Sequence, residues 1–516
     1  MTTALACCCA DAATSPADRG NVVQLSPFEV TAEKMDFSSW IKVQSPNFVI
    51  YTDASGKEAT QLAKHFEMTL QAAQFFFRRD RRSSLPVIIV LPTSRSDWRK
   101  IKSTNVQWQV TASIREHTRG IVLAEYDWQE QPAPLFAMVG DHAVTLMNLD
   151  GPRWFGCGIT EFFETVEFDG STLKIGKQNA MSIALIRGGW MNWPHFFKIV
   201  GSSPEYRQDI PAHFQYFGQA AAFTHYLLTS GDSANVERLL RWSALLETGA
   251  EPTNENFKQL FGVDFAGMQK RINDLMAGGH YMSSKISFPP EAMKYPITIA
   301  NVHTPEMREL FVLCRAMVQD TPESGEAIDS LALSGVKNEE LREVFVDTCL
   351  THNRKAEALK QLRILIDNGS TNPDVFSEAA RVRLEASSEH IDLETRLGSE
   401  VEEIERWATR AVELDPLDFR ASECLAWAEA LGATVTKANV DVISQTCHRL
   451  NNRAPTDGAL AALAIAHWRM GDTAKVHEIT AILLRSPYTR PNSKACALAL
   501  EQELSSPATT ADQKAK

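Results

Sequence analysis

The sequence predicts two fold classes in succession, an α+β N-terminal half and an all-α C-terminal half of helical repeats. Short β-type runs alternate with amphipathic helices up to residue 278. From residue 306 onward, helical periodicity continues with almost no strand signal, and proline-ended units recur. The expected divisions are a disordered leader, an α+β domain, a linker, the helical repeats and a disordered tail, at 1–37, 38–278, 279–305, 306–505 and 506–516.

Size and composition bound the class of protein. A chain of 516 residues exceeds one ordinary core, so two to four domains are expected. Its 44% apolar and 22% charged residues are typical of a globular protein, and no run of 18 apolar residues predicts a membrane span. The net charge of −12 argues against a nucleic-acid partner, because phosphate binding needs a basic face.

The first residues indicate export. Met1–Ala13 is small and apolar like the end of a signal peptide, but it lacks a basic start and a full apolar segment. We therefore expect the true start to lie upstream and the protein to be periplasmic or secreted. The alternative is a cytoplasmic protein with a disordered tail, and the sequence leaves both open.

The α+β half follows from β-type runs and helical spacings. Strands are expected at Phe48–Thr52, Pro86–Leu91 and Gly120–Glu125, with a hairpin around Gly170. Helices are expected at Lys57–Phe77, Pro132–Leu149, Phe155–Val166, Phe214–Leu228, Val236–Leu246, Phe257–Phe265 and Met268–Leu275. The stretch 279–305 contains four prolines and is interpreted as a linker or an extended crossing segment with few contacts.

The second half contains units that end in proline. Pro373, Pro416, Pro455 and Pro487 are separated by 43, 39 and 32 residues. In the clearest unit, Asp457–Pro487, one helix leads to a Gly-Asp turn and a second helix. This pattern resembles degenerate tetratricopeptide (TPR) repeats, whose period is 34 residues. Because each such unit buries its apolar face only against neighbours, three to five helix pairs are expected.

The stretch expected to carry chemistry is Met138–Glu164, MVGDHAVTLMNLDGPRWFGCGITEFFE. Its helix, Pro-Arg-Trp turn and second helix resemble the bacterial peptidase MA-like (DUF1570-type) family of gluzincin-like proteins. The run from Trp40 to Tyr51, the strand Pro86–Leu91, the helix around His225 and the Phe261-Gly262 end agree with this resemblance. It covers about residues 38–278 and implies a zincin-like α+β fold.

The resemblance also implies where zinc ligands would lie. In HExxH, two histidines four residues apart share one helical face and bind zinc, while the glutamate activates water. Aligned on the Pro-Arg-Trp turn, this chain has Gly140 and Val144 at the histidines, Asp141 at the glutamate and Cys157 at the third ligand. Every ligand is replaced, so the ancestral zinc is predicted to be lost, and no other cofactor is expected.

Two nearby side chains offer alternative chemistry. His142 lies two residues from Gly140, about 200° round the helix, and no other histidine stands four residues from it. It is therefore expected to be an ordinary hydrogen-bonded or exposed histidine. Cys157, between two glycines at a helix start, is a candidate nucleophile, with His142 or His225 as its base. The sequence leaves the reactivity of this thiol open.

These observations favour a catalytically inactive, peptidase-like protein that binds a protein or peptide through its TPR-like array, with a second binding surface in the degenerate cleft. One alternative is an active metallohydrolase with a non-standard ligand set. Another is a purely structural component of an envelope complex. The sequence does not identify the partner or the oligomeric state.

Overall fold

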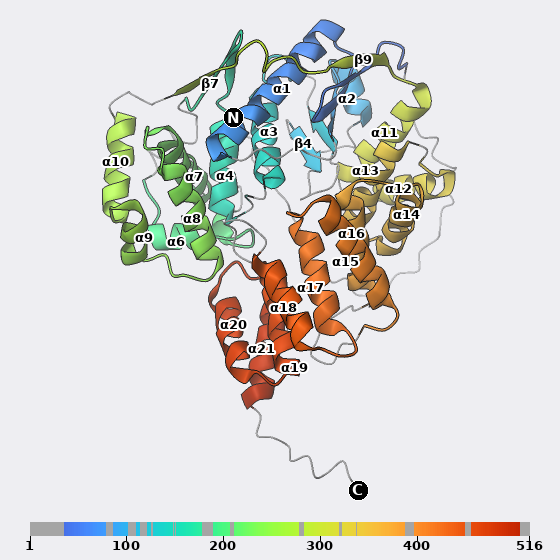
Figure 1. Ribbon diagram of the computed structural model, residues 1–516. Helices are drawn as coiled ribbons and strands as arrows, with labels where there is room; N and C mark the ends of the chain where they lie inside the picture. Colours follow the sequence, from blue (N-terminus) through green and yellow to red (C-terminus); the bar gives the residue numbers. More distant parts are fainter. Residues whose placement is uncertain are drawn as a thin grey trace, which may run out of the picture.

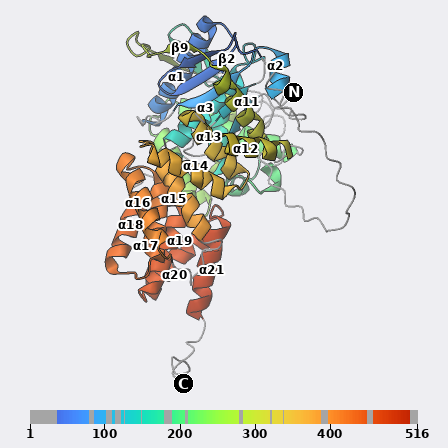
Figure 2. The same ribbon diagram turned by 90° about the vertical axis from the view of Figure 1, so that its right-hand side faces the viewer.

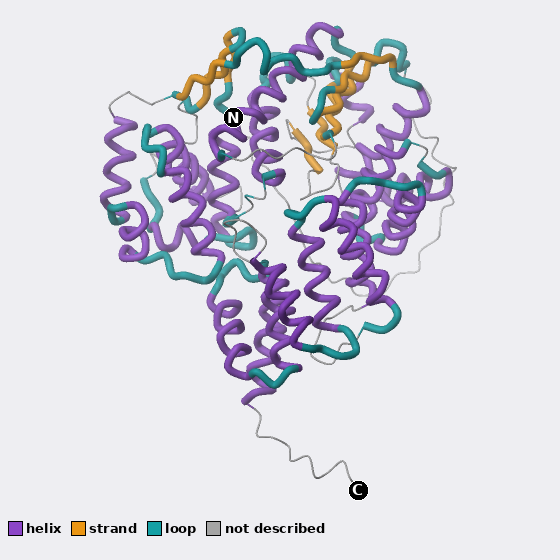
Figure 3. Tube along the Cα trace, in the orientation of Figure 1, coloured by secondary structure: helices purple, strands orange, loops and turns teal. Residues whose placement is uncertain are grey.

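The computed structural model describes residues 36–78, 86–101, 110–113, 121–124, 127–147, 149, 151–177, 189–206, 211–277, 283–318, 322–336, 338–387, 397–448 and 456–505 (Figure 1). This part of the chain is mostly helical, with its strands confined to the N-terminal portion and to one end of the molecule (Figure 3). The expected leader and tail lie, apart from residues 36 and 37, outside the described residues. No helix in the described ranges is long and apolar enough to cross a membrane.

A six-stranded mixed sheet organises the N-terminal half, with strand order β4-β5-β3-β2-β1-β9. The three central strands β2, β3 and β5 are parallel, and the outer strands pair antiparallel to them or to each other. The strands are β1 (Ile41–Gln44), β2 (Phe48–Thr52), β3 (Val87–Leu91), β4 (Val110–Ser113), β5 (Ile121–Ala124) and β9 (Thr298–Asn301). The central strands are buried throughout, as continuous apolar runs predict.

Each face of this sheet is covered by a different part of the chain. Side chains alternate along a strand, so Val49 and Tyr51 face one way and Phe48 and Ile50 the other. The face with Phe48 and Ile50 packs against helices α1 (Gly56–Phe77) and α3 (Ala133–Leu146). The face with Val49 and Tyr51 belongs to the same apolar cluster as the C-terminal helices. The sheet is therefore shared between the two halves.

A second group of elements extends the N-terminal half away from the sheet. A three-stranded antiparallel sheet contains β6 (Glu167–Asp169), β7 (Thr172–Ile175) and β8 (Ser284–Ser287). Beside it, helices bury a large group of aromatic rings, among them Trp154, Phe197, Trp242 and Phe257. These helices are α4 (Arg153–Phe163), α6 (Trp193–Lys198), α7 (Pro211–Thr229), α8 (Asn235–Glu247), α9 (Asn254–Phe261) and α10 (Phe265–Ala277).

The expected linker has a different role from the one predicted. The described part of 279–305 supplies β8, which pairs with β7, and β9, which pairs with β1. The prolines suggested an unpaired segment, but β8 and β9 pair with strands more than 100 residues away in the sequence. The described strands are incompatible with few contacts and agree with the other alternative, an extended crossing segment, because they complete both sheets.

The C-terminal part is an array of helical hairpins. Its helices are α11 (Thr304–Val318), α12 (Pro322–Ser334), α13 (Glu339–Thr351), α14 (Lys355–Asp367), α15 (Pro373–Ser387), α16 (Glu400–Leu414), α17 (Phe419–Leu431), α18 (Lys437–His448), α19 (Asp457–Arg469), α20 (Thr473–Arg485) and α21 (Pro491–Ser505). They form five pairs with α21 at the end, and α15, α17, α19 and α21 stack in succession. The starts of α13 and α15, like those of α19 and α21, are 34 residues apart. The repeat-like second half is as the sequence predicts.

Both ends of the array contact the N-terminal half. At its start, Phe311 of α11 stacks on Phe37 with ring centroids 5.2 Å apart and meets the edge of Trp40 at 5.4 Å. At its far end, the Ser486 hydroxyl donates to the carbonyl oxygen of Glu247 (2.9 Å), and the Tyr488 hydroxyl donates to that of Phe197. The array thus arches from the sheet back to the α6–α8 region (Figures 1 and 2).

Candidate functional site

The two helices that the resemblance assigns to metal binding are α3 and α4, joined by a short connection around Gly151. They pack against each other, and α4 also packs against α7. A Cβ built on Gly151 would lie 2.4 Å from the Ser243 hydroxyl, so the connection passes close to α8. This geometry places Gly140, Asp141, Val144 and Cys157 near one helix crossing and shows what surrounds each of them.

Gly140 lies where α3 packs closely against the Phe163 side chain of α4. A Cβ at this position would lie 2.6 Å from both the Cβ and the Cγ of Phe163, a separation that real Cβ atoms essentially never show. Phe163 itself is fully buried. In the HExxH motif, the first histidine would stand at position 140, and the space for its side chain is filled by the packed ring of Phe163. Glycine is required at this position because a larger side chain would clash with that ring, not because of its backbone conformation.

Val144 and Cys157 lie in the same apolar cluster. Their exposed fractions are 3% and 9%. Burial raises the pKa of the Cys157 thiol to about 12, with further contributions from the carboxylates of Glu161 and Asp141 and opposition from Arg153. The thiol is protonated at neutral pH, which is the opposite of what a cysteine nucleophile needs. These surroundings do not favour Cys157 as a nucleophile.

Asp141 points to a different side of α3 from Gly140 and Val144. Its side chain is exposed to solvent, although surrounding protein raises its pKa by desolvation, against the lowering effect of Arg153. Arg153 also lies over the ring of Tyr206, 5.8 Å from its centroid. The carboxylate thus has a nearby cation, which the sequence pattern did not reveal.

Neither candidate histidine serves as a base for Cys157. His142 is buried beside Phe48, with ring centroids 6.2 Å apart, and burial lowers its pKa to about 4, so it is neutral. His225 makes a 2.7 Å hydrogen bond between its Nε2 and the carbonyl oxygen of Gly176. The described residues contain no group of three or more His, Cys, Asp or Glu side chains able to hold a metal. The ring of His142 is not exposed, and its Nε2 is buried without a hydrogen-bond partner among the residues that the structure describes.

Gly158 marks a second close crossing, between α4 and α7. A Cβ there would lie 2.1 Å from the Thr224 hydroxyl and 2.7 Å from the carbonyl oxygen of Ala220. Gly156, two residues earlier on the same helix, has nothing within 4 Å of the equivalent position. In the Gly-Cys-Gly sequence, packing therefore requires glycine at position 158 but not at position 156.

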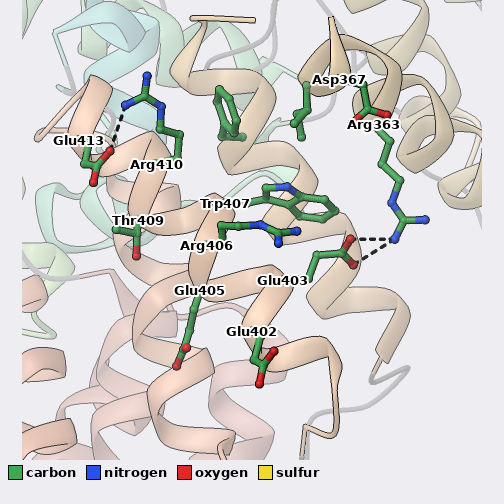
Figure 4. Close-up of a pocket in the computed structure, with 12 residues that line it drawn as sticks. Arg363, Asp367, Glu402, Glu403, Glu405, Arg406, Trp407, Thr409, Arg410 and Glu413 are labelled. Atoms are coloured by element: carbon green, nitrogen blue, oxygen red, sulfur yellow. Dashed lines mark hydrogen bonds and ion pairs between the residues drawn. The ribbon is translucent and has the colours of Figure 1, made fainter. Parts of the chain in front are cut away.

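The described part of the array contains a groove of about 820 Å³ between α14 and α16. Ile366, Phe376 and Trp407 form its apolar lining, while the remaining lining residues are almost all charged. Arg363 spans the groove from α14 and pairs with Glu403 of α16 at 3.0 Å (Figure 4). No local sequence pattern indicates this groove, because its residues come from three helices and are spread over about fifty positions.

Comparisons with known proteins leave the family open. No protein-family model matches the chain, and no curated protein matches it either. Among solved structures, the chain is similar to a thermophilic TPR protein from Thermus thermophilus, with 14% identity over 39% of this chain and 96% of that one. The TM-score of that match is 0.26, so it carries no argument here. The description of the array rests on its own helix pairs and spacing.

Proposed function

We propose that this protein is a non-catalytic scaffold that binds a partner protein through its helical array. The observation that carries the proposal is the open α14–α16 groove, in an array of five helix pairs whose two ends are anchored on the N-terminal half. Stacked helix pairs present extended surfaces that suit peptide segments and protein partners.

For the N-terminal half, we propose a peptidase-like scaffold without its zinc site. Its support is the pair α3 and α4 at the places the resemblance requires, joined by a short turn. The residues present do not fit a zinc ion, because Gly140 and Val144 supply no ligand atom and Phe163 fills the adjacent space. We therefore assign no reaction step to this helix pair and propose that it supports the fold.

Site-specific photo-cross-linking in cells that express the protein natively tests this proposal. A photoreactive residue is placed at Thr409 in the groove, at the exposed Leu333 and Leu498 elsewhere on the array, and at the exposed Phe75 on α1 as control. We expect a discrete protein adduct from at least one array position and none from Phe75. Adducts from Phe75 alone, or from no array position, would contradict a binding role for the array.

A further inference from the structure

We propose that the α14–α16 groove takes a positively charged, Lys- or Arg-rich peptide segment of the partner. This inference rests on the proposed function, since it names the chemistry of the segment that the array binds. The first observation is the balance of charge. Of the twelve lining residues, five are acidic (Asp367, Glu402, Glu403, Glu405 and Glu413) and three are basic (Arg363, Arg406 and Arg410).

The second observation is which of these charges already have partners. Two of the arginines already have ion-pair partners, Arg363 with Glu403 and Arg410 with Glu413, each at 3.0 Å. Glu403 also pairs at 3.2 Å with Arg383, which is not a lining residue. The three remaining carboxylates, Asp367, Glu402 and Glu405, have no ion-pair partner in the part of the chain that the structure describes. Glu402 and Glu405 extend in the same direction from α16 (Figure 4). An incoming cation therefore finds free acceptors.

The third observation concerns the cost of this arrangement in the free protein. Partial burial raises the pKa of Glu405, and repulsion from Glu429 and Glu402 raises it further. Like charges at this spacing destabilise each other, and a bound ammonium or guanidinium group relieves the repulsion. The apolar lining from Ile366, Phe376 and Trp407 offers contact for the methylene stems of Lys and Arg side chains. Arg406 is the one positively charged residue among the described lining residues that has no ion-pair partner. Its charge would repel a bound cation.

The groove is tested on the full-length chain with a fluorescent twelve-residue peptide of alternating Lys, Arg and Leu, followed by fluorescence anisotropy. The triple variant Asp367→Asn, Glu402→Gln, Glu405→Gln removes the free carboxylates at nearly constant shape. We expect this triple variant to bind the peptide about tenfold more weakly, because the small contributions of three charge contacts are lost together. Arg406→Gln is expected to strengthen binding by about two- to fivefold, an effect that damage to the fold cannot produce.

The matched control removes the same charge elsewhere. Glu130, Glu255 and Glu503 are exposed carboxylates outside the groove, and their triple change to Gln is expected to leave affinity unchanged. Equal loss in both triple variants would show general attraction to an acidic protein, and absence of peptide binding would overturn the proposal outright. If array cross-links to a partner persist unchanged in the groove variant, the binding of a cationic segment in the groove is refuted while the binding role of the array stands. If no array position cross-links, both fail.

Discussion

Replacing Gly158 by alanine should destabilise the protein by about 3 kcal/mol or more, whereas Gly156→Ala should stabilise it by about 0.5–1 kcal/mol. The added methyl at position 158 meets the Ala220 carbonyl oxygen at 2.7 Å, and this backbone atom moves only if α7 shifts away from α4. At position 156 the methyl meets nothing, so the lower entropy of the unfolded chain and the better helix propensity of alanine remain.

Both variants are compared with the parent protein by chemical denaturation monitored by circular dichroism. The two sites lie on the same helix and receive the same atom, so the contrast isolates the contact with α7. Equal stabilities for the two variants would show that α4 and α7 do not cross as closely as described. A milder version of the same test is Gly140→Ala, where the obstacle is a side chain, Phe163, and a compensating Phe163→Leu change should recover part of the loss.

The second large effect is expected at the junction between the sheet and the array. Phe311→Ala removes a 2% exposed ring that contacts both Phe37 and Trp40, and should cost about 3–5 kcal/mol. Because the cluster contains residues of both halves, we expect the sheet and the array to be destabilised together. Hydrogen exchange read by mass spectrometry should show increased exchange in β2 and β3 as well as in α11 and α13.

Phe75→Ala is the control, because this ring is 69% exposed and its loss should change stability by less than about 0.5 kcal/mol. The sequence alone predicts that 306–505 folds as an independent fragment. The shared cluster predicts instead that this fragment exposes Met307 and Phe311 and loses order in its first helix pairs. If the fragment melts cooperatively with full helix content, or if Phe311→Ala affects only the array, the two halves do not share a core.

Local patterns predicted the parts of the fold that are held by local interactions. The helix at Lys57–Phe77 is α1 within one residue, and its Ser55 and Glu58 form a reciprocal capping box. The buried runs that became β2, β3 and β5 were recognisable because parallel central strands are continuously apolar. The helical spacing of the second half likewise predicted a repeat-like array.

Non-local pairing explains what was missed. β9 has four exposed residues, so nothing in its own pattern indicates a strand, and only its register with β1 makes it one. β1 and β4, which the sequence also did not predict, have only four residues each. The prolines around β8 and β9 favoured a linker because the strands that pair with this segment lie far away in the sequence. Strand pairing with distant parts of the chain cannot be predicted from the pattern of about ten neighbouring residues.

At the candidate site, the sequence predicted which residue types are missing but not what replaces them. The absence of His at positions 140 and 144 is visible in the sequence. The filling of that space by Phe163, the protonated thiol of Cys157 and the proximity of Arg153 to Asp141 require coordinates. A consequence is that Gly140→His, Val144→His and Cys157→Glu together should not create a zinc site unless Phe163 is also made smaller.

We propose that α3 and α4 form a packed structural joint and that the protein acts by binding rather than by metal-dependent catalysis. The most direct test is the zinc content of the purified full-length chain by plasma mass spectrometry, alongside a general peptidase assay. We expect far less than one zinc per chain, no peptide hydrolysis, and no change in either quantity on Cys157→Ser or Asp141→Asn. About one zinc per chain that is lost in either variant, together with peptide hydrolysis, would contradict it.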